Sequence, residues 1–210
     1  MPEILKHINK DLLREFKKSI PEIKKSQVAQ RPWPPQSKAY GVGGNTFRAY
    51  SGLTGKPSHH FREWAESQIE NLAAIEAEKI STQEKFDKWH QALADSLQKL
   101  WRKRECGKDL SVSHKYKLVD LFVKWLAEHK LPNEDVVKHL INFRHCALDR
   151  QTLEKINQHL GGAIPMSNPS MGLIATEATY EFCQNIIKEY CLAAGGTSLL
   201  FDFFAWKSGE

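Results

Sequence analysis

Two ionisable residues, Lys117 and Asp149, occupy helix positions at which their charges could serve a reaction. Asp149 lies in the segment RHCALDRQTLEKI (residues 144–156), where an N-cap is expected for the helix that follows. The amino terminus of a helix favours an anion, so we expect Asp149 to stay ionised. A fixed carboxylate can stabilise positive charge that develops during a reaction, and this use is compatible with capping.

The segment around Lys117, residues 111–130, predicts a helix that is apolar around most of its circumference. Its apolar side chains are Leu118, Val119, Leu121, Phe122, Val123, Trp125 and Leu126. At about 100° per residue, one polar stripe remains, formed by Ser113, Lys117, Asp120, Lys124 and Glu128. Such a helix is largely buried, so the stripe should face a cleft or a thin solvent window. The alternative is a solvated stripe with Lys117–Asp120 and Asp120–Lys124 ion pairs.

A basic cluster in residues 100–108 (LWRKRECGK) offers contact with phosphate groups. Its cations are Arg102, Lys103, Arg104 and Lys108. They could complement the dipole at a helix carboxyl terminus or contact a nucleic-acid backbone, and the residue types do not separate these uses. Arg150 could contact a DNA phosphate or pair with a carboxylate, and the sequence does not decide between these partners. The formal net charge of +5 permits a nucleic-acid partner without requiring one.

The histidines and cysteines predict no metal site. The pair His59–His60 and the set His139, His145 and Cys146 match no standard zinc spacing. We therefore expect packing or surface roles for them and no metal or other cofactor. Four cysteines without a C-x-x-C pair, in a chain without a signal peptide, favour reduced thiols in a cytoplasm. No stretch is long and apolar enough to span a membrane.

The elements that must position these residues are helices, because no segment shows the alternation of a strand. We expect an all-α fold of about seven to nine helices in one compact domain over residues 1–210. Residues 1–57 would hold an amino-terminal helix at 3–19 and a loop rich in Pro, Gly and aromatic residues at 30–57. Residues 58–210 would form the helical core. The glycines of GVGG (residues 41–44) follow no strand, so a turn is expected there rather than a phosphate-binding loop.

Capping residues set the expected helix boundaries. Pro21 should end the first helix or open the next short segment, and Ser58 should cap the second helix. Ser81 and Glu84 should form a capping box for the third, and Gly107 should end it. The apolar tail, TSLLFDFFAW, should dock into the core.

Three motifs in a fixed order resemble the archaeal 8-oxoguanine DNA glycosylases, a divergent branch of the helix-hairpin-helix DNA glycosylases. KLVDLFVK, from Lys117 to Lys124, resembles the catalytic-lysine helix of that family, and Asp149 follows 32 positions after Lys117. HCALDR, ending at Arg150, resembles the segment that leads into the catalytic aspartate. DFFAW, from Asp202 to Trp206, resembles a carboxyl-terminal motif of the base pocket. The resemblance covers roughly residues 85–206.

The resemblance implies a glycosylase-like helical fold with a cleft between two lobes. It assigns catalysis to Lys117 and Asp149 and a base pocket to Asp202, Trp206 and Phe122. The implied activity is removal of an oxidised or modified base, similar to 8-oxoguanine, through a lysine Schiff base, with AP-lyase cleavage of the strand. The implied partner is double-stranded DNA containing such a base, contacted through Arg102, Lys103, Arg104, Lys108 and Arg150. We expect a monomer, without cofactor, acting at the nucleoid in the cytoplasm.

Two alternatives stay open. A helical DNA-binding or interaction protein could keep the fold without the chemistry. Leu121, one turn after Lys117 where an aromatic is expected, and the single hairpin glycine Gly107 favour that alternative. An all-α scaffold without any nucleic-acid role is the third possibility.

Overall fold

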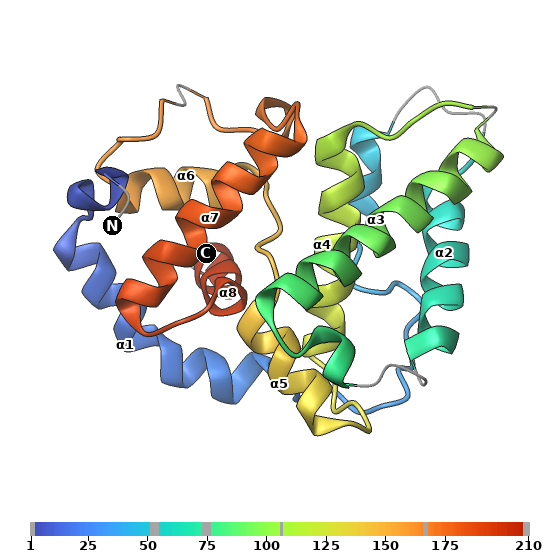
Figure 1. The fold of residues 1–210 in the computed structure, drawn as a ribbon, viewed down its shortest axis with the longest axis horizontal. Helices are drawn as coiled ribbons and strands as arrows, with labels where there is room; N and C mark the ends of the chain where they lie inside the picture. The colour runs from blue at the N-terminus through green and yellow to red at the C-terminus, as the bar shows by residue number, and fades with distance from the viewer. Residues whose placement is uncertain (1–2, 51–54, 73–76, 106, 166–167, 208–210) are drawn as a thin grey trace.

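The computed structural model describes residues 3–50, 55–72, 77–105, 107–165 and 168–207, and the named elements within these ranges are all helices (Figure 1). The α-helices of this part of the chain are α1 (Lys10–Gln27), α2 (Pro57–Leu72), α3 (Gln83–Arg104), α4 (Val112–Ala127), α5 (Glu134–Phe143), α6 (Arg150–His159), α7 (Glu177–Ala194) and α8 (Ser198–Lys207). Short 3₁₀ helices are η1 (Glu3–His7), η2 (Gly44–Ala49), η3 (Ala77–Ile80) and η4 (Met171–Leu173). The predicted all-α fold with seven to nine helices is confirmed.

Two groups of helices flank α5. In Figure 1, α2, α3 and α4 lie on one side, and α1, α6, α7 and α8 lie on the other. α5 contacts both α4 and α8, and α8 also contacts α1, α6 and α7. The tail docks into the core as predicted, since Leu199, Leu200 and Phe201 are fully buried. The cleft between two lobes that the resemblance implies stays a prediction.

α4 is buried along most of its length, as its apolar circumference predicts. Phe122 stacks on Trp125 and packs edge-on against Trp64 of α2. From the loop before α2, Trp33 and Tyr40 pack against Trp125, with ring centroids 6.2 and 5.4 Å away. Packing from both sides fixes the rotation of α4 about its axis and therefore the direction of its polar stripe.

The glycine turn in this loop makes the close approach to α4 possible. Gly41 has a φ of +82°, and a Cβ there would lie 2.6 Å from the Leu121 carbonyl oxygen and 2.6 Å from Trp125 Cβ. Only glycine avoids both the strained dihedral and the clash. The turn predicted for GVGG is confirmed here, while Gly44 begins η2. Part of the long loop, residues 51–54, lies outside the described residues.

The first helix differs from the prediction at both ends. Asn9 caps α1 by accepting hydrogen bonds from the Asp11 and Leu12 amides, so the chain before it forms the separate η1. α1 then continues through Pro21 to Gln27. A proline inside a helix removes one hydrogen bond and crowds the preceding turn. Burial of Ile20 and Ile23 against the core offsets that cost, so the helix is not ended there.

Two further caps are shifted from their expected positions. Thr82, not Ser81, caps α3 by accepting from the Lys85 amide at 3.3 Å. Glu84 extends outward and pairs with Lys88 instead of closing a capping box. Ser58 lies inside α2, which begins at Pro57, a residue that suits a first helical position. These boundaries move by one or two residues without changing which helices exist.

The cysteines within the described residues, Cys146, Cys183 and Cys191, are buried and carry free thiols. Cys106 lies outside the described residues. Within the part of the chain that is described, none of the helices has the length and apolar character that crossing a bilayer requires.

His159 at the end of α6 should make the protein sensitive to acid. Its ring is buried among Tyr190, Phe201 and Phe204 and bonds the Tyr190 hydroxyl. Burial, with a contribution from Lys155, lowers its pKa from 6.5 to about 4. An unfolded histidine titrates near 6.5, so the unfolded chain takes up this proton first. The associated stability is therefore complete above pH 6.5 and lost as pH falls toward 4, a loss of up to about 3 kcal/mol.

The measurement is the free energy of unfolding in urea between pH 4 and 7, for wild type and His159→Gln. We expect a flatter pH dependence in the variant over this window. His59→Gln is the matched control, because His59 is exposed. Equal slopes for wild type and His159→Gln would contradict the assignment.

Candidate active site

Lys117 and Asp149, which are 32 positions apart, meet in the folded chain. The Lys117 Nζ lies 3.3 Å from Asp149 Oδ2. Lys117 projects from α4, and Asp149 caps α6. The lysine side chain is 15 % exposed and the aspartate side chain 9 %, so the pair is largely removed from water while both keep some open surface. The structure thus brings together the two residues that the sequence assigns to catalysis.

Asp149 is held in place by its own helix. Its Oδ1 accepts a hydrogen bond from the Thr152 amide at 3.0 Å. The Thr152 hydroxyl accepts from the Asp149 amide at 2.9 Å and can donate to the Ala147 carbonyl at 3.0 Å. The predicted cap is confirmed, and it is a reciprocal capping box with Thr152. Oδ1 of Asp149 therefore caps α6, and Oδ2 faces Lys117.

Asp120 does not pair with Lys117, so the alternative of a solvated stripe with Lys117–Asp120 and Asp120–Lys124 ion pairs is wrong. Asp120 is buried and contacts His90 Nε2 at 2.8 Å, and it accepts from the Tyr180 hydroxyl at 3.0 Å. Burial raises the pKa of Asp120 to about 7, although nearby cations and Tyr180 oppose the shift. Because α4 is covered on several sides, four residues of the stripe have a partner on another helix or segment: Lys117, Asp120, Lys124 and Glu128. Lys117 is left to Asp149, and Lys124 pairs with Asp202.

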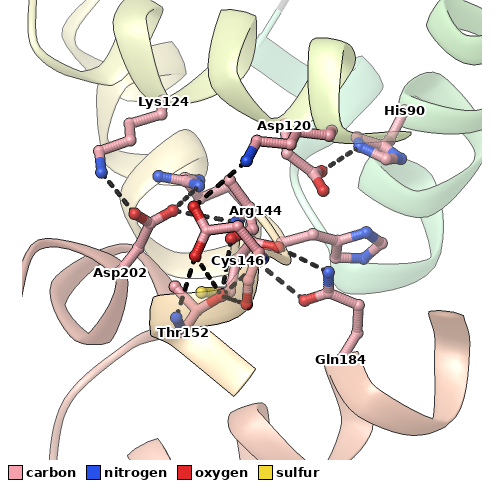
Figure 2. Close-up of polar contacts among 12 residues, drawn as sticks. His90, Asp120, Lys124, Arg144, Cys146, Thr152, Gln184 and Asp202 are labelled. Carbon is pink, nitrogen blue, oxygen red and sulfur yellow. Dashed lines mark hydrogen bonds and ion pairs between the residues drawn. The ribbon is translucent and has the colours of Figure 1, made fainter. Parts of the chain in front are cut away.

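Asp202 on α8 anchors a second group of charges next to this pair. It is fully buried between Lys124 and Arg144, and its Oδ2 lies 2.7 Å from Arg144 Nη2 (Figure 2). Burial alone would raise the pKa of Asp202, but the two cations hold the pKa below its usual value. The carboxylate is therefore ionised and links α4, α8 and the segment that follows α5.

The segment from Arg144 to Asp149 is clamped from two sides. Asp202 Oδ2 accepts a hydrogen bond from the Ala147 amide at 3.0 Å. Gln184 of α7 accepts from the Cys146 amide at 2.9 Å and donates to the Cys146 carbonyl at 2.7 Å. Residues 145–148 are not helical, so these contacts fix where α6 begins. Asp202 and Gln184 consequently position Asp149 opposite Lys117.

Sequence reasoning missed three residues of this arrangement. Arg144 and Gln184 act through tertiary contacts that no local sequence pattern predicts. Thr152 occupies the third position after the Asp149 cap, where a capping box usually has Glu or Gln, so the position but not the residue type matches the sequence pattern. Their shared role is to hold the Asp149 segment in place.

The three residues assigned to a base pocket lie in different environments. Asp202 is buried under Lys124 and Arg144. Trp206, four residues later on α8, is 47 % exposed and offers an open aromatic face. Phe122 is fully buried against Trp64 and Trp125. It follows Lys117 by five residues, which at about 100° per residue turns it some 140° away from the lysine.

Most of the residues assigned to phosphate contact lie at the surface in ion pairs. Arg102, Lys103, Arg104, Lys108 and Arg150 are all exposed. Three of them are paired with carboxylates: Arg102 with Asp109 at 2.7 Å, Arg104 with Glu63 at 3.0 Å and Arg150 with Glu154 at 2.6 Å. Exposed ion pairs contribute little free energy of stabilisation, so a phosphate could displace these carboxylates with only a small loss of free energy.

Chemically, the site combines an amine that can act as a nucleophile with a carboxylate that can take its proton and stabilise a cation. Comparisons with protein-family models, with curated proteins and with solved structures found no match for this chain. The case for a function therefore depends on the geometry of the site.

Proposed function

We propose that this protein is a DNA N-glycosylase with AP-lyase activity that removes an oxidised or modified base, such as 8-oxoguanine. One observation carries the proposal: the Lys117 amine of α4 lies 3.3 Å from the carboxylate of Asp149, the N-cap of α6. The two groups required for amine-based glycosylase chemistry are thus close enough to act on one reacting centre.

In the first step, the neutral Lys117 amine attacks C1′ of the target nucleotide. The bond between C1′ and the base nitrogen breaks, and its electron pair leaves with the base. Asp149 accepts the proton released by the amine and passes it to the departing base. The same carboxylate stabilises the positive charge that develops on the sugar.

In the second step, the bond between Lys117 and C1′ becomes a Schiff base as the sugar ring opens, and the ring oxygen takes up a proton. Loss of a proton from C2′ then expels the 3′ phosphate by β-elimination. Asp149 is the nearest group identified for moving these protons. Water finally hydrolyses the Schiff base and restores the lysine.

The target base must leave the DNA stack to reach Lys117. The exposed indole of Trp206 can supply a flat stacking surface for the extruded base. Asp202 lies four residues earlier on the same helix and is fully buried, so it would contribute by holding Lys124 and Arg144 in place. The exposed cations of α3 and α6, including Lys103 and Arg150, can hold the phosphate backbone, so binding should weaken steeply with salt.

The test is borohydride trapping with the full chain and a duplex that contains one 8-oxoguanine. A Schiff base reduced by borohydride gives a stable protein–DNA adduct, which mass spectrometry can assign to a lysine. Undamaged duplex and omission of the reductant are the controls. Absence of both an adduct and base release, across a panel of oxidised and alkylated bases, would overturn the proposal.

A second candidate function is DNA binding without catalysis. The complete burial of Phe122, which leaves one predicted pocket residue without an open surface, favours it. This function predicts salt-sensitive binding to duplex DNA and no release of any base. Substitution of Lys117 would then change binding only slightly.

A further inference from the structure

A cluster of possible metal ligands lies one helical turn from Lys117. His90 of α3, Asp120 of α4 and His145 of the segment after α5 each present one ligand atom, and these atoms lie within 4.8 Å of one another. We propose that this cluster binds one divalent transition-metal ion of the zinc class. The site is separate from the Lys117–Asp149 pair and does not depend on the function proposed for it.

The donor set suits such an ion. Two imidazoles and one carboxylate are common ligands of zinc and of neighbouring divalent metals. With metal–ligand bonds of about 2.0–2.1 Å, tetrahedral ligands lie about 3.3 Å apart, so the three groups need only small side-chain rotations to converge. The Tyr180 hydroxyl, 3.0 Å from both Asp120 oxygens and from His145 Nδ1, marks a fourth position that a water molecule or the tyrosine itself can fill.

His145 is oriented as metal-binding histidines usually are. Its Nε2 lies 3.0 Å from Asp87 Oδ1, and Gln83 donates to the same oxygen at 2.8 Å. A carboxylate on one ring nitrogen fixes the tautomer and the ring orientation and leaves the other nitrogen for the metal. Here that other nitrogen is Nδ1, the atom connected to Asp120 through Tyr180.

The charges around Asp120 also favour a cation. Asp202 is equally buried and has two cations, Lys124 and Arg144, within ion-pair distance. Asp120, among the residues that the structure describes, forms its ion-pair contact with His90 alone. A buried carboxylate is costly unless it is paired or coordinates a metal. A divalent ion would supply at Asp120 the positive charge that Lys124 and Arg144 supply at Asp202.

Two of the three proposed ligands lie at the wall of a groove that is open to solvent. His90 and His145 line an open groove of about 470 Å³, together with Tyr116 and Tyr180. An ion could enter through this groove and keep an exchangeable water on its open side. Because the ligands come from α3, α4 and the 144–149 segment, a bound ion would join the two segments that carry Lys117 and Asp149.

The experiment uses the full chain after treatment with a chelator, titrated with Co²⁺ as a spectroscopic probe and with Zn²⁺. We expect one ion per chain, visible d–d absorption from Co²⁺, and displacement of Co²⁺ by Zn²⁺. Zn²⁺ at about a hundredfold above the dissociation constant should raise the Tm by roughly 5–10 °C. Neither readout involves DNA, so failure of this proposal and failure of the glycosylase proposal are distinguishable.

The test variant is His145→Gln, which keeps a polar side chain at a site near the surface. It should lose the Co²⁺ absorption and the rise in Tm while it keeps the helical circular dichroism of wild type. His139→Gln is the control, because His139 lies outside the cluster. Absence of Co²⁺ absorption and of a Zn²⁺-dependent Tm shift in wild type would overturn the proposal. Retention of both signals at wild-type strength in His145→Gln would overturn it equally.

Discussion

Replacing Lys117 with glutamine should abolish borohydride trapping and lower the rate of base release by roughly 10³-fold or more. Removal of the nucleophile of a covalent mechanism eliminates the step that it performs, and comparable losses follow removal of other catalytic nucleophiles. Glutamine preserves most of the side-chain length and can still bond Asp149 Oδ2, so the helix cap and the packing of α4 should survive. Single-turnover kinetics on an 8-oxoguanine duplex provide the measurement.

Two controls separate chemistry from binding and folding. Lys138→Gln removes an exposed lysine from α5 that is not part of the Lys117–Asp149 site, and it should leave trapping at the wild-type level. The Lys117→Gln protein should keep the Tm of wild type to within a few degrees and bind the same duplex with similar affinity. An undiminished adduct in Lys117→Gln would assign the nucleophile to another lysine.

The places of Lys117 and Asp149 on their helices could be predicted from the sequence, because a local rule determines each of them. The apolar circumference of residues 111–130 places Lys117 on a polar stripe, and the N-cap position places Asp149 at the start of a helix. Both features depend on residues a few positions apart, and the structure confirms them. The resemblance to a family supplied the expectation that the two side chains face each other.

The partners of Asp120 could not be predicted from the sequence. Asp120 lies three residues after Lys117 and four residues before Lys124, which is the spacing of ion pairs on a helix surface. Its partners in the structure, His90 and Tyr180, are 30 and 60 positions away. Helical spacing predicts which residues are neighbours on one helix. Tertiary packing can bring in partners from other helices, and here these partners replace the neighbours on the same helix. Pro21 shows the same limit, because core burial keeps α1 intact through a residue that usually ends a helix.

Asp202→Ala should destabilise the fold by about 3–5 kcal/mol, the largest stability effect we expect from a single substitution. Removing one partner of a buried ion pair leaves the other charges uncompensated, and here Lys124 and Arg144 would both lose their carboxylate. The Ala147 amide would lose its acceptor as well. Urea denaturation of wild type and variant measures the difference. Asp109→Asn, which removes an exposed partner of Arg102, should leave the midpoint almost unchanged.

Lost charge pairing can be separated from lost volume by a double-mutant cycle. If uncompensated cations cause the loss of stability, removing Arg144 as well should restore part of it. The double variant Asp202→Leu with Arg144→Met should then be more stable than Asp202→Leu alone. Lost packing alone predicts that the two substitutions simply add. The cycle also bears on the active site, because Asp202 holds the segment that carries Asp149. Stability should recover in the double variant without recovery of base release, since the Ala147 amide still lacks the acceptor that positions Asp149.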